Sequence, residues 1–487
     1  MSSSLNAGLS GMGISTQMSQ LSSVLLSHKS IYQPKGSQAL TPTSRNESNY
    51  LAPVNGVINP PYTTGYKVVY ALPKSSTLIG KMWSEITLTA AQTNPAYTPP
   101  VPANTLSVPQ TAAVPAVGTP QAEYVKNVGD LIFEEIILRY GSTVLQQYDS
   151  EFQVFYRQLS RNNVNIEYIN VEVLGALPPG GNTEQTLVDA LYRGVRLRHP
   201  VEHLWFVQQR DQNWMPESLA LEGQLEFTLR NLAQLIVTAS GTNSVFTGGA
   251  SVLPTISDLR LRYQEITLSA SEKENRLRFY KAPEGLVNMM YDIETQRGFR
   301  QQGTGAGGNI TLNVPLTNFR LDMKEVIFTV RIAEDTGAVV LPGYVYGADL
   351  RDWRGSRCEA NVSTPSLLGG GGGHIGVAYP GVIDFKMTAG GKDMINPLPE
   401  LYTRCHARKE YHPDAQTSGA VYHLPFAVFP EDSRNATGHA SASVLGNLAL
   451  VITCTNPGAH IVLQVDVWSM GYNVNQSRAG GIAKALH

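Results

Sequence analysis

The sequence predicts a large, mostly-β protein of two parts, and three observations support this. Short runs of β-forming residues alternate apolar and polar positions, as in Leu259–Leu268 and His460–Val474. Gly and Pro are frequent, with 44 and 29 copies, as expected for many turns between short strands. A stretch rich in Gly, Ser and Thr, Ser240–Ser251, divides the chain into halves of roughly 200 residues, each large enough for a β-sandwich.

The composition restricts the classes of function. The 487-residue chain has a formal net charge of -2, whereas a protein that coats nucleic acid needs a strong excess of Lys and Arg. Charged residues make up only 16% of the chain, which suits a surface largely covered by copies of the same protein. Cys358, Cys405 and Cys454 cannot form a disulfide framework, and no signal peptide or membrane-length apolar run is visible. We therefore expect synthesis in a reducing, intracellular compartment.

The stretch Thr417–Ile452 is the most informative part of the sequence. The apolar run Val421–Phe429 is followed by Pro430-Glu431-Asp432, which cannot continue a strand. A cluster of turn-forming residues comes next, and Leu445–Ile452 returns as a second apolar run. Two strands joined as a hairpin by a shaped polar connection are therefore predicted.

The first half is expected to consist of strands and one short helix. Strands are predicted over Tyr66–Leu72, Gly80–Leu88, Asp130–Tyr140, Val144–Tyr148, Val201–Phe206, Leu219–Leu229 and Leu232–Thr238. A helix is predicted over Ser150–Leu159, because Phe152, Phe155, Tyr156 and Leu159 share one helical face. Ser150 and Gln153 have the spacing of a capping box at its start.

The second half is expected to repeat this arrangement. Leu259–Leu268 is predicted to be its first strand, and the charged segment Glu272–Arg278 a turn. The spacing of Leu286, Met289, Met290 and Ile293 predicts a helix over Pro283–Thr295. The later strands are predicted over Val421–Phe429, Leu445–Ile452 and His460–Val474. His203-Leu204-Trp205-Phe206 and His423-Leu424-Pro425-Phe426 are expected to be matching strands of the two halves.

Several segments are expected to lie outside this framework. The arm Met1–Arg45 carries a short apolar stripe, Ile14 to Leu25, that is too short to be a stable helix alone, so we expect it to fold against a partner. Ala90–Gln121 is so rich in Pro that neither a central strand nor a helix can form there, and a long surface loop is predicted. Long loops are also expected at Arg351–Ile375 and Tyr402–Gly419.

Four segments, in this order, resemble the double jelly-roll major capsid proteins of nucleocytoplasmic large DNA viruses, of the iridovirus, asfarvirus and phycodnavirus type. They are Gly129–Leu159, Leu312–Arg331 with Lys324-Glu325-Val326-Ile327 at its centre, Phe426–Glu431, and Gly471–Val474 followed by Gly480-Gly481. In the first of them, Ser142 stands where the family has a second turn glycine. The resemblance covers roughly Tyr66 to Gly481.

The resemblance implies an all-β fold of two consecutive eight-stranded jelly rolls with short helices in the connections. We expect an N-terminal arm over residues 1–45, a first jelly roll over 46–250 with the insertion 90–121, a second over 251–475, and a tail over 476–487. The implied function is that of a major capsid protein. Such proteins form homotrimeric, pseudo-hexagonal capsomers that build the icosahedral shell of a large double-stranded DNA virus.

The same resemblance implies the partners and the location. The expected partners are further copies of the chain, neighbouring capsomers, minor capsid and penton proteins and, through the arm, an internal membrane, with no direct contact to nucleic acid. The protein would be made in the host cytoplasm and end in the virion shell. Two alternatives remain open: a minor or penton-type capsid protein of the same fold, and a carbohydrate-binding jelly-roll protein.

No enzyme, catalytic residue, cofactor site or metal site is predicted. A cupin-type enzyme on a jelly roll needs a His-x-His pair, which the sequence lacks. Cys405, His406 and His412 lie near one another but lack a fourth ligand and a second close pair at zinc-ligand spacing. If a metal were bound, His406 and His412 would be the first residues to test.

Other candidate motifs are also not expected to form functional sites. Neither Gly369–Gly373 nor Gly390-Gly391-Lys392-Asp393 continues into the Lys-Ser/Thr of a phosphate-binding loop. Glu134 and Glu135 are adjacent in a predicted strand, so their carboxylates are expected on opposite faces. Glycosylation sequons begin at Asn46, Asn309, Asn361 and Asn435, and they are expected to remain unmodified by the host secretory route.

Overall fold

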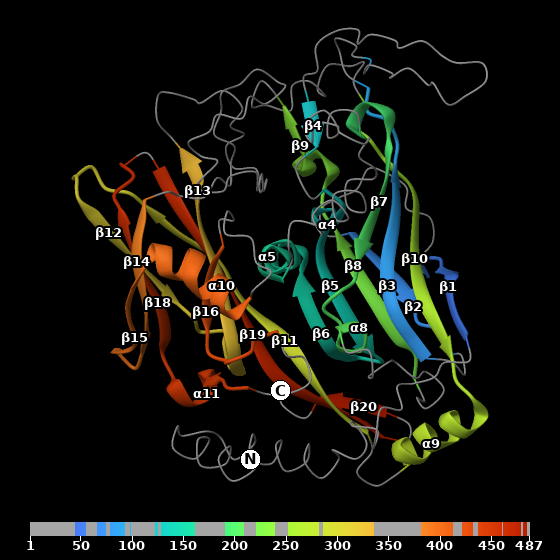
Figure 1. Cartoon of the computed structure of the whole chain (residues 1–487). Coiled ribbons are helices and arrows are strands. Elements are labelled where there is room, and N and C mark those ends of the chain that lie inside the picture. The colour runs from blue at the N-terminus through green and yellow to red at the C-terminus, as the bar shows by residue number, and fades with distance from the viewer. Residues whose placement is uncertain are drawn as a thin grey trace, which may run out of the picture.

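The computed structural model describes two β-sandwiches with short helices in their connections (Figure 1). The described residues are 44–54, 66–74, 78–92, 98, 122–124, 128–160, 190–208, 221–238, 252–281, 286–335, 381–412, 421–431, 437–459, 461–478 and 481–484. The predicted arm except Ser44 and Arg45, most of Ala90–Gln121 and the loop Arg351–Ile375 lie outside them. Within them, no helix is long and apolar enough to cross a membrane.

The first sandwich consists of two four-stranded antiparallel sheets with the orders β1-β10-β3-β7 and β2-β8-β5-β6. Its strands are β1 (Ser44–Leu51), β2 (Tyr66–Ala71), β3 (Leu78–Leu88), β5 (Phe133–Tyr140), β6 (Thr143–Asp149), β7 (Val195–Pro200), β8 (Gly223–Leu229) and β10 (Ile256–Thr267). A separate small sheet pairs β4 (Ala122–Tyr124) with β9 (Ile236–Thr238). Alternate residues of the two large sheets meet in one core, where the rings of Tyr70 and Phe227 pack edge to face.

The second sandwich has the sheet orders β11-β19-β13-β16 and β12-β18-β14-β15. Its strands are β11 (Leu286–Gln302), β12 (Asn309–Pro315), β13 (Asp322–Asp335), β14 (Val382–Ala389), β15 (Lys392–Pro399), β16 (Tyr422–Pro425), β18 (Leu448–Thr455) and β19 (Ile461–Arg478). The short strands β17 (Ala440–Ser441) and β20 (Gly481–Lys484) extend the first of these sheets. Phe328, Phe385 and Tyr422 pack together in its core.

The two sandwiches have the same strand order. When the eight main strands of each are counted along the chain, one sheet has the order first, eighth, third, sixth and the other second, seventh, fourth, fifth. In both, the chain crosses between the sheets at every step except the hairpin from the fourth to the fifth strand. In both, a helical segment follows that fifth strand: α5 (Ser150–Ser160) in the first sandwich, and η4 (Tyr402–His406) with α10 (Ala407–Tyr411) in the second. The architecture is therefore duplicated.

The boundary between the halves differs from the expected position after residue 250. β10 pairs with β1 and β3, so it completes the first sandwich. The change of sandwich falls at helix α9 (Ala270–Lys281), between β10 and β11. The stretch Ser240–Ser251 lies outside the described residues and precedes β10, the last strand of the first sandwich, so it is not the boundary between the halves. The expected tail 476–487 is also partly structured, because β19 runs to Arg478 and β20 pairs with it.

The helix predicted over Pro283–Thr295 is a strand, and the charged segment before it is a helix. The residues from Leu286 onward form β11, which pairs with β19 from Leu286–Ser477 to Gln302–Val462. This long-range pairing overrides a four-residue helical spacing, which is a weak signal over so short a window. Glu272–Arg278 lies within α9, where Glu274 and Arg278 form an exposed ion pair one turn apart.

The stretch Thr417–Ile452 does not form a hairpin. Its first strand, β16, pairs with β13, whereas its second, β18, pairs with β12 and β14 in the facing sheet. Between them, helix α11 (Ala442–Leu445) ends at Leu445, the residue that was predicted to begin the second strand. Strand order in a jelly roll depends on pairing across the whole half, so neighbours in sequence need not be neighbours in a sheet.

Three further predictions for loops and strands differ from the structure. Val201–Phe206 is not a strand, because β7 ends at Pro200 and helix α8 (Trp205–Gln208) follows, so the two His-Leu-x-Phe segments do not match. Leu232–Thr238 begins as the helical turn η2 (Leu232–Leu235) before β9. Tyr402–Gly419 begins with η4 and α10, and its residues 413–419 are outside the described part. A further short helix, α4 (Val128–Leu131), precedes β5.

The helix predicted over Ser150–Leu159 is confirmed as α5, but its cap is different. The backbone N–H of Phe152 donates to Asp149 Oδ1 at 2.7 Å, so Asp149 caps the helix. Ser150 instead donates to the carbonyl of Phe133, and Gln153 Nε2 donates to the carbonyl of Pro200 at 2.6 Å. Figure 1 shows α5 between the two sandwiches. Its apolar side chains belong to a core cluster that contains residues of both sandwiches.

Candidate functional site

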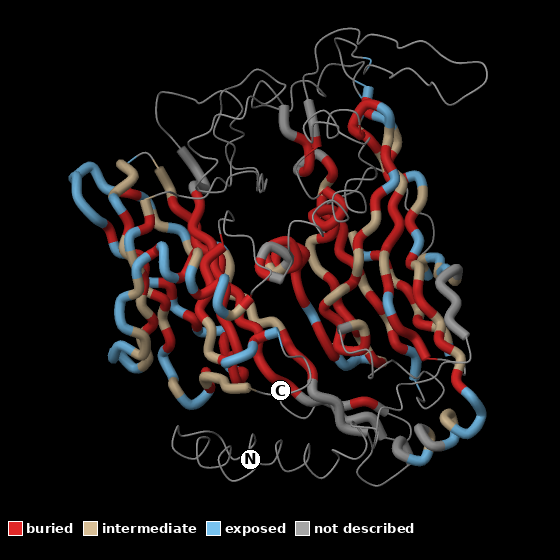
Figure 2. Tube along the Cα trace, viewed as in Figure 1, coloured by how far each residue is buried: buried red, intermediate tan, exposed pale blue. Residues whose placement is uncertain are grey.

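The contact between the two sandwiches, which we call the joint, is formed by the outer face of the sheet β11-β19-β13-β16. Along β19, Leu463, Val465 and Val467 point into the second core. On the opposite face, Trp468, Met470 and Tyr472 belong to the apolar cluster of the first sandwich. The centre of this sheet is thus buried on both faces, as the continuous red along β13 and β19 shows (Figure 2).

Trp468 is the central aromatic side chain of the joint. Its ring lies 5.0 Å from that of Phe155 on α5, measured between centroids. Its indole Nε1–H donates to Asp149 Oδ2 at 2.8 Å, so the aspartate that caps α5 also holds the second sandwich. Burial raises the pKa of Asp149, with Arg297 opposing that effect. One side chain therefore couples the start of α5 to the middle of β19.

Charged and amide side chains fix the joint at two more places. Glu151 on α5 is fully buried, and its Oε1 accepts from Arg230 at 3.1 Å and lies 2.9 Å from the guanidinium of Arg297 on β11. Gln146 on β6 donates from Nε2 to the carbonyl of Tyr291 on β11 at 2.9 Å. Directional contacts of this kind specify one relative position of the two sandwiches, which apolar contact alone does not.

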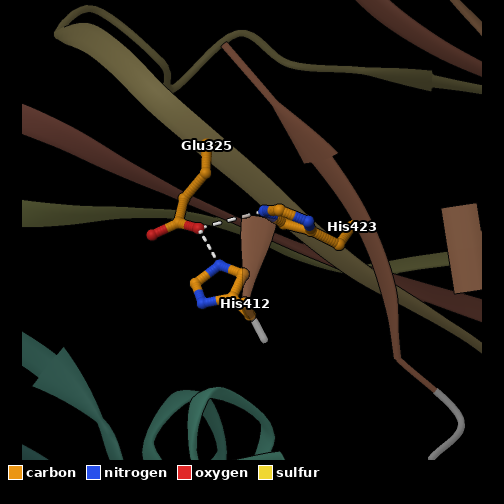
Figure 3. A group of neighbouring side chains, drawn as sticks. All are labelled: Glu325, His412 and His423. Carbon is orange, nitrogen blue, oxygen red and sulfur yellow. Dashed lines mark hydrogen bonds and ion pairs between the residues drawn. The ribbon is translucent and has the colours of Figure 1, made fainter. Parts of the chain in front are cut away.

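A buried group of Glu325, His412 and His423 lies at the edge of the joint (Figure 3). Glu325 is on β13, His423 on β16, and His412 follows the last turn of α10. Oε2 of Glu325 is 2.9 Å from Nε2 of His412 and 3.0 Å from Nε2 of His423. The other ring nitrogen of His412, Nδ1, is 3.0 Å from Oε1 of Glu431, whose side chain is 41% exposed.

The hydrogen-bond geometry assigns the protons of the two histidines. Both nitrogens of His412 face carboxylate oxygens, which only accept, so both must carry a proton. Burial alone would lower the pKa of His412, but Glu325 and Glu431 outweigh it and raise the pKa above its usual value. Burial lowers the pKa of His423 to about 4, so this ring is neutral and donates through Nε2. Its buried Nδ1 has no hydrogen-bond partner within the described residues.

Lys324 completes the charge balance. Its Nζ is 3.3 Å from Oε1 of Glu325, 2.5 Å from the carbonyl oxygen of Pro430 and 4.1 Å from the ring centroid of Tyr291. Burial alone would raise the pKa of Glu325, but Lys324 and His412 hold it well below its usual value. Two cations, Lys324 and His412, therefore face two carboxylates, Glu325 and Glu431.

These three side chains could supply ligands to a metal ion, but the contacts between them are those of a hydrogen-bonded proton network. The three possible ligand atoms lie within 4.8 Å of one another, a spacing that a zinc ion could span. However, Nε2 of each histidine already donates to the same carboxylate oxygen, and a dication there would lie beside the ammonium of Lys324. A zinc ion held by these three atoms would have to displace both hydrogen bonds and would be repelled by the ammonium of Lys324.

The residues singled out in the sequence are mostly separated in space. Of Cys405, His406 and His412, only His412 enters the buried group. His406 is exposed and stacks on Tyr402 at 6.3 Å, and Cys405 is half-buried. The sequence analysis missed Glu325 and His423. A charged pair, Lys324-Glu325, directly before the apolar run Val326-Ile327-Phe328 of β13 was the available signal, because buried charges require partners.

The two adjacent glutamates lie in one cavity and not on opposite faces. The pairing of β5 with β8 shifts register between Phe133 and Glu135, and this bulge breaks the alternation. Glu134 and Glu135 both line a cavity of about 660 Å³ between the first sandwich and β11. The cavity also contains Asp149, Glu294 and three basic side chains, Lys67, Arg297 and Arg320.

The remaining motifs lie in a turn, in strands or outside the described residues. Gly390 and Gly391 form the two-residue turn between β14 and β15, and both have positive φ, +56° and +82°, which glycine adopts without strain. Asn309 is exposed at the start of β12, and Asn46 lies in β1. Asn361, Asn435 and Gly369–Gly373 lie outside the described residues.

Comparison with known proteins gives structural matches only. No family model matches the sequence, and neither does any curated protein. The structure of VP54 from PBCV-1 superposes with a TM-score of 0.62 at 16% identity, over 93% of this chain and 100% of VP54. The Faustovirus major capsid protein superposes with a TM-score of 0.61 at 11% identity, over 90% of this chain and 92% of that one.

A third match extends to a virophage. A chain from the Sputnik virophage structure superposes with a TM-score of 0.53 at 8% identity, over 91% of this chain and 89% of that chain. Each match spans both sandwiches, and each sandwich has the strand order described above. The chain is a double jelly roll. The joint is therefore the contact between its two jelly rolls.

Proposed function

We propose that this double jelly roll is a capsid protein, and specifically the major capsid protein of a large double-stranded DNA virus. The observation that carries the proposal is the duplicated eight-stranded topology, together with likeness over about nine-tenths of the chain to a Faustovirus protein described as a major capsid protein. A structure of the PBCV-1 virus capsid contains a chain that is as similar to this protein as VP54 is. No catalytic residue set is found among the described residues, so the function assigned is geometric.

The joint supports this function physically. A shell unit must present its jelly rolls at one fixed angle, because each copy contacts its neighbours through both. Trp468, Glu151 and Gln146 each fix the two jelly rolls by directional contacts within a buried surface. In the proposed capsomer, three copies place six jelly rolls in a pseudo-hexagonal ring, which tiles an icosahedral shell with minor capsid and penton proteins at the remaining positions.

Native mass spectrometry of the purified full-length protein tests the proposed trimer. We expect a mass of three chains at micromolar concentration, and negative-stain images with a hexagonal outline. A chain that is only monomeric under these conditions contradicts the proposal. Copy number in the purified particle separates a major capsid protein from a minor or penton-type one. Specific binding on a glycan array by a monomer would favour the carbohydrate-binding alternative.

We further propose that the arm Met1–Arg45 contributes to assembly and not to the trimer. The sequence supports this, because its apolar stripe is too short to be stable alone and too apolar for a spacer. In the shell it would contact neighbouring capsomers, minor proteins or an internal membrane. A variant lacking Met1–Ala39 is expected to form trimers with an unchanged melting temperature and to assemble poorly. Normal assembly of this variant would contradict the proposed role, and loss of the trimer would place the arm in the trimer itself.

A further inference from the structure

We propose that the imidazolium of His412 is a proton-dependent fastener, which holds the turn Ala427–Glu431 and the end of α10 against the joint. This proposal does not depend on the capsid function. Its basis is the position of His412 between two carboxylates that come from different segments, Glu325 on β13 and Glu431 at the end of the turn. Glu325 belongs to the sheet of the joint, and Glu431 belongs to a turn that crosses its edge.

The turn is held at its two ends by two adjacent residues of β13 and by His412. The backbone N–H groups of Phe426 and Ala427 both donate to the carbonyl of Lys324 at 2.8 Å. At the far end, the carbonyl of Pro430 accepts from Lys324 Nζ, and Glu431 accepts from His412. Between these ends, Val428 and Phe429 are 59% and 65% exposed, and the backbone N–H of Phe429 donates to Thr437 Oγ1 at 3.0 Å.

His412 can donate to Glu325 and to Glu431 at the same time only if its ring carries two protons. A doubly protonated ring donates to Glu325 and Glu431 at the same time. A neutral ring donates to one carboxylate only, and its unprotonated nitrogen then faces the other carboxylate at about 3 Å, lone pair to lone pair. Loss of the proton therefore weakens either the contact to β13 or the contact to the turn.

Several titratable groups pack around His412, and of these groups it is the proton of His412 itself that is lost as the pH rises from acidic to alkaline. From β13 come Glu325 and Lys324, from the turn Glu431, and from β16 His423, which is neutral above about pH 4. From α5, the ring of Tyr156 packs at 6.2 Å, and burial together with Glu325 keeps its pKa well above the usual value.

On α10 itself, Arg408 is buried and donates to the carbonyl of Val421. Burial lowers the pKa of Arg408 to about 10, so it remains a cation at neutral pH.

The direction of the pH dependence follows from the raised pKa of His412. The folded chain holds this proton at pH values where the unfolded chain, with the ordinary histidine pKa near 6.5, has released it. The stabilisation is therefore complete below about pH 6.5 and is lost as the pH rises through the folded pKa. The fastener is closed at mildly acidic pH and opens as the pH rises through the folded pKa of His412.

Thermal unfolding of the full-length protein between pH 6 and pH 9 tests the proposal, with His412→Gln as the variant and His406→Gln as the control. His406 precedes α10 and is exposed, so its variant should follow the wild-type profile. We expect the wild-type melting temperature to fall by roughly 1–2 °C over this range and that of His412→Gln to change much less. Parallel profiles for the wild type and His412→Gln would overturn the proposal.

Two further measurements keep the test decisive. If His412→Gln does not fold, Glu431→Gln removes one of the two carboxylates at a partly exposed position, and it should shift the alkaline loss of stability to lower pH. An unshifted profile for that variant counts against the fastener. Melting with equimolar zinc chloride and with a chelator should give the same temperature. A stoichiometric zinc stabilisation that His423→Ala abolishes would instead identify the group as a metal site and overturn the proposal.

Discussion

At the scale of single residues, the side chains that matter most are buried and have partners from distant parts of the chain. Trp468 and Asp149 are 319 positions apart, and Glu325 and His423 are 98 apart. Aromatic spacing located Phe155 correctly, because the period of a helix depends only on nearby residues. The partners of charged residues could not be located in this way, because nothing local identifies them.

Replacing Phe155 by Ala should destabilise the protein by about 3–5 kcal/mol, because its fully buried ring fills the space between α5 and Trp468. Chemical denaturation of the two proteins measures this difference. Phe429→Ala is the matched control: this ring is 65% exposed, and its loss should change the free energy of unfolding by less than about 0.5 kcal/mol. A cost below roughly 1 kcal/mol for Phe155→Ala would mean that the joint is loosely packed.

His423 should make the protein sensitive to acid. Its folded pKa, about 4, lies below the ordinary value of 6.5, so between these values the unfolded chain binds a proton that the folded chain does not. Stability should therefore fall as the pH decreases from 6.5 to 4. In His423→Gln the slope of melting temperature against pH in this window should become shallower. An unchanged slope would mean that other groups dominate acid unfolding.

At the scale of elements, α5 links the two jelly rolls, and its charged residue Glu151 is the point to test. Glu151→Ala leaves Arg230, which is only 5% exposed, without this carboxylate and breaks the contact to Arg297 on β11. We expect a loss of about 3–5 kcal/mol in the free energy of unfolding. Glu274→Ala on α9 breaks an ion pair that is about two-thirds exposed, and it should cost less than about 1 kcal/mol. Equal effects of the two changes would show that the joint charges are solvated.

The elements also show where local pattern fails. β11 was predicted to be a helix from four apolar positions, and α9 a turn from its charges. The two errors have different causes. β11 is specified by its long-range pairing with β19. α9 is an exposed helix with few apolar contacts, so its sequence carries no apolar stripe.

At the scale of the whole molecule, the two jelly rolls should unfold together. The apolar cluster of the first jelly roll includes Ile327, Trp468, Met470 and Tyr472 from the second, so the first core is not complete without the second jelly roll. We expect a single calorimetric transition, with the calorimetric enthalpy equal to the van't Hoff enthalpy when measured on the monomeric protein. Two separate transitions would contradict this. Glu151→Ala, which weakens the joint, is the variant in which the transition is expected to broaden or split.

The sequence by itself determined that this is a mostly-β chain in two halves, with a helix at Ser150 and strands at most of the alternating runs. These properties depend on residues within a few positions of one another, so period and turn composition reveal them. Tertiary structure alone decided that β10 belongs to the first jelly roll, that β16 and β18 lie in facing sheets, and that His412, His423 and Glu325 meet. Strand pairing and the burial of charge are settled between segments far apart in sequence. Their energies come from contacts that no single segment contains.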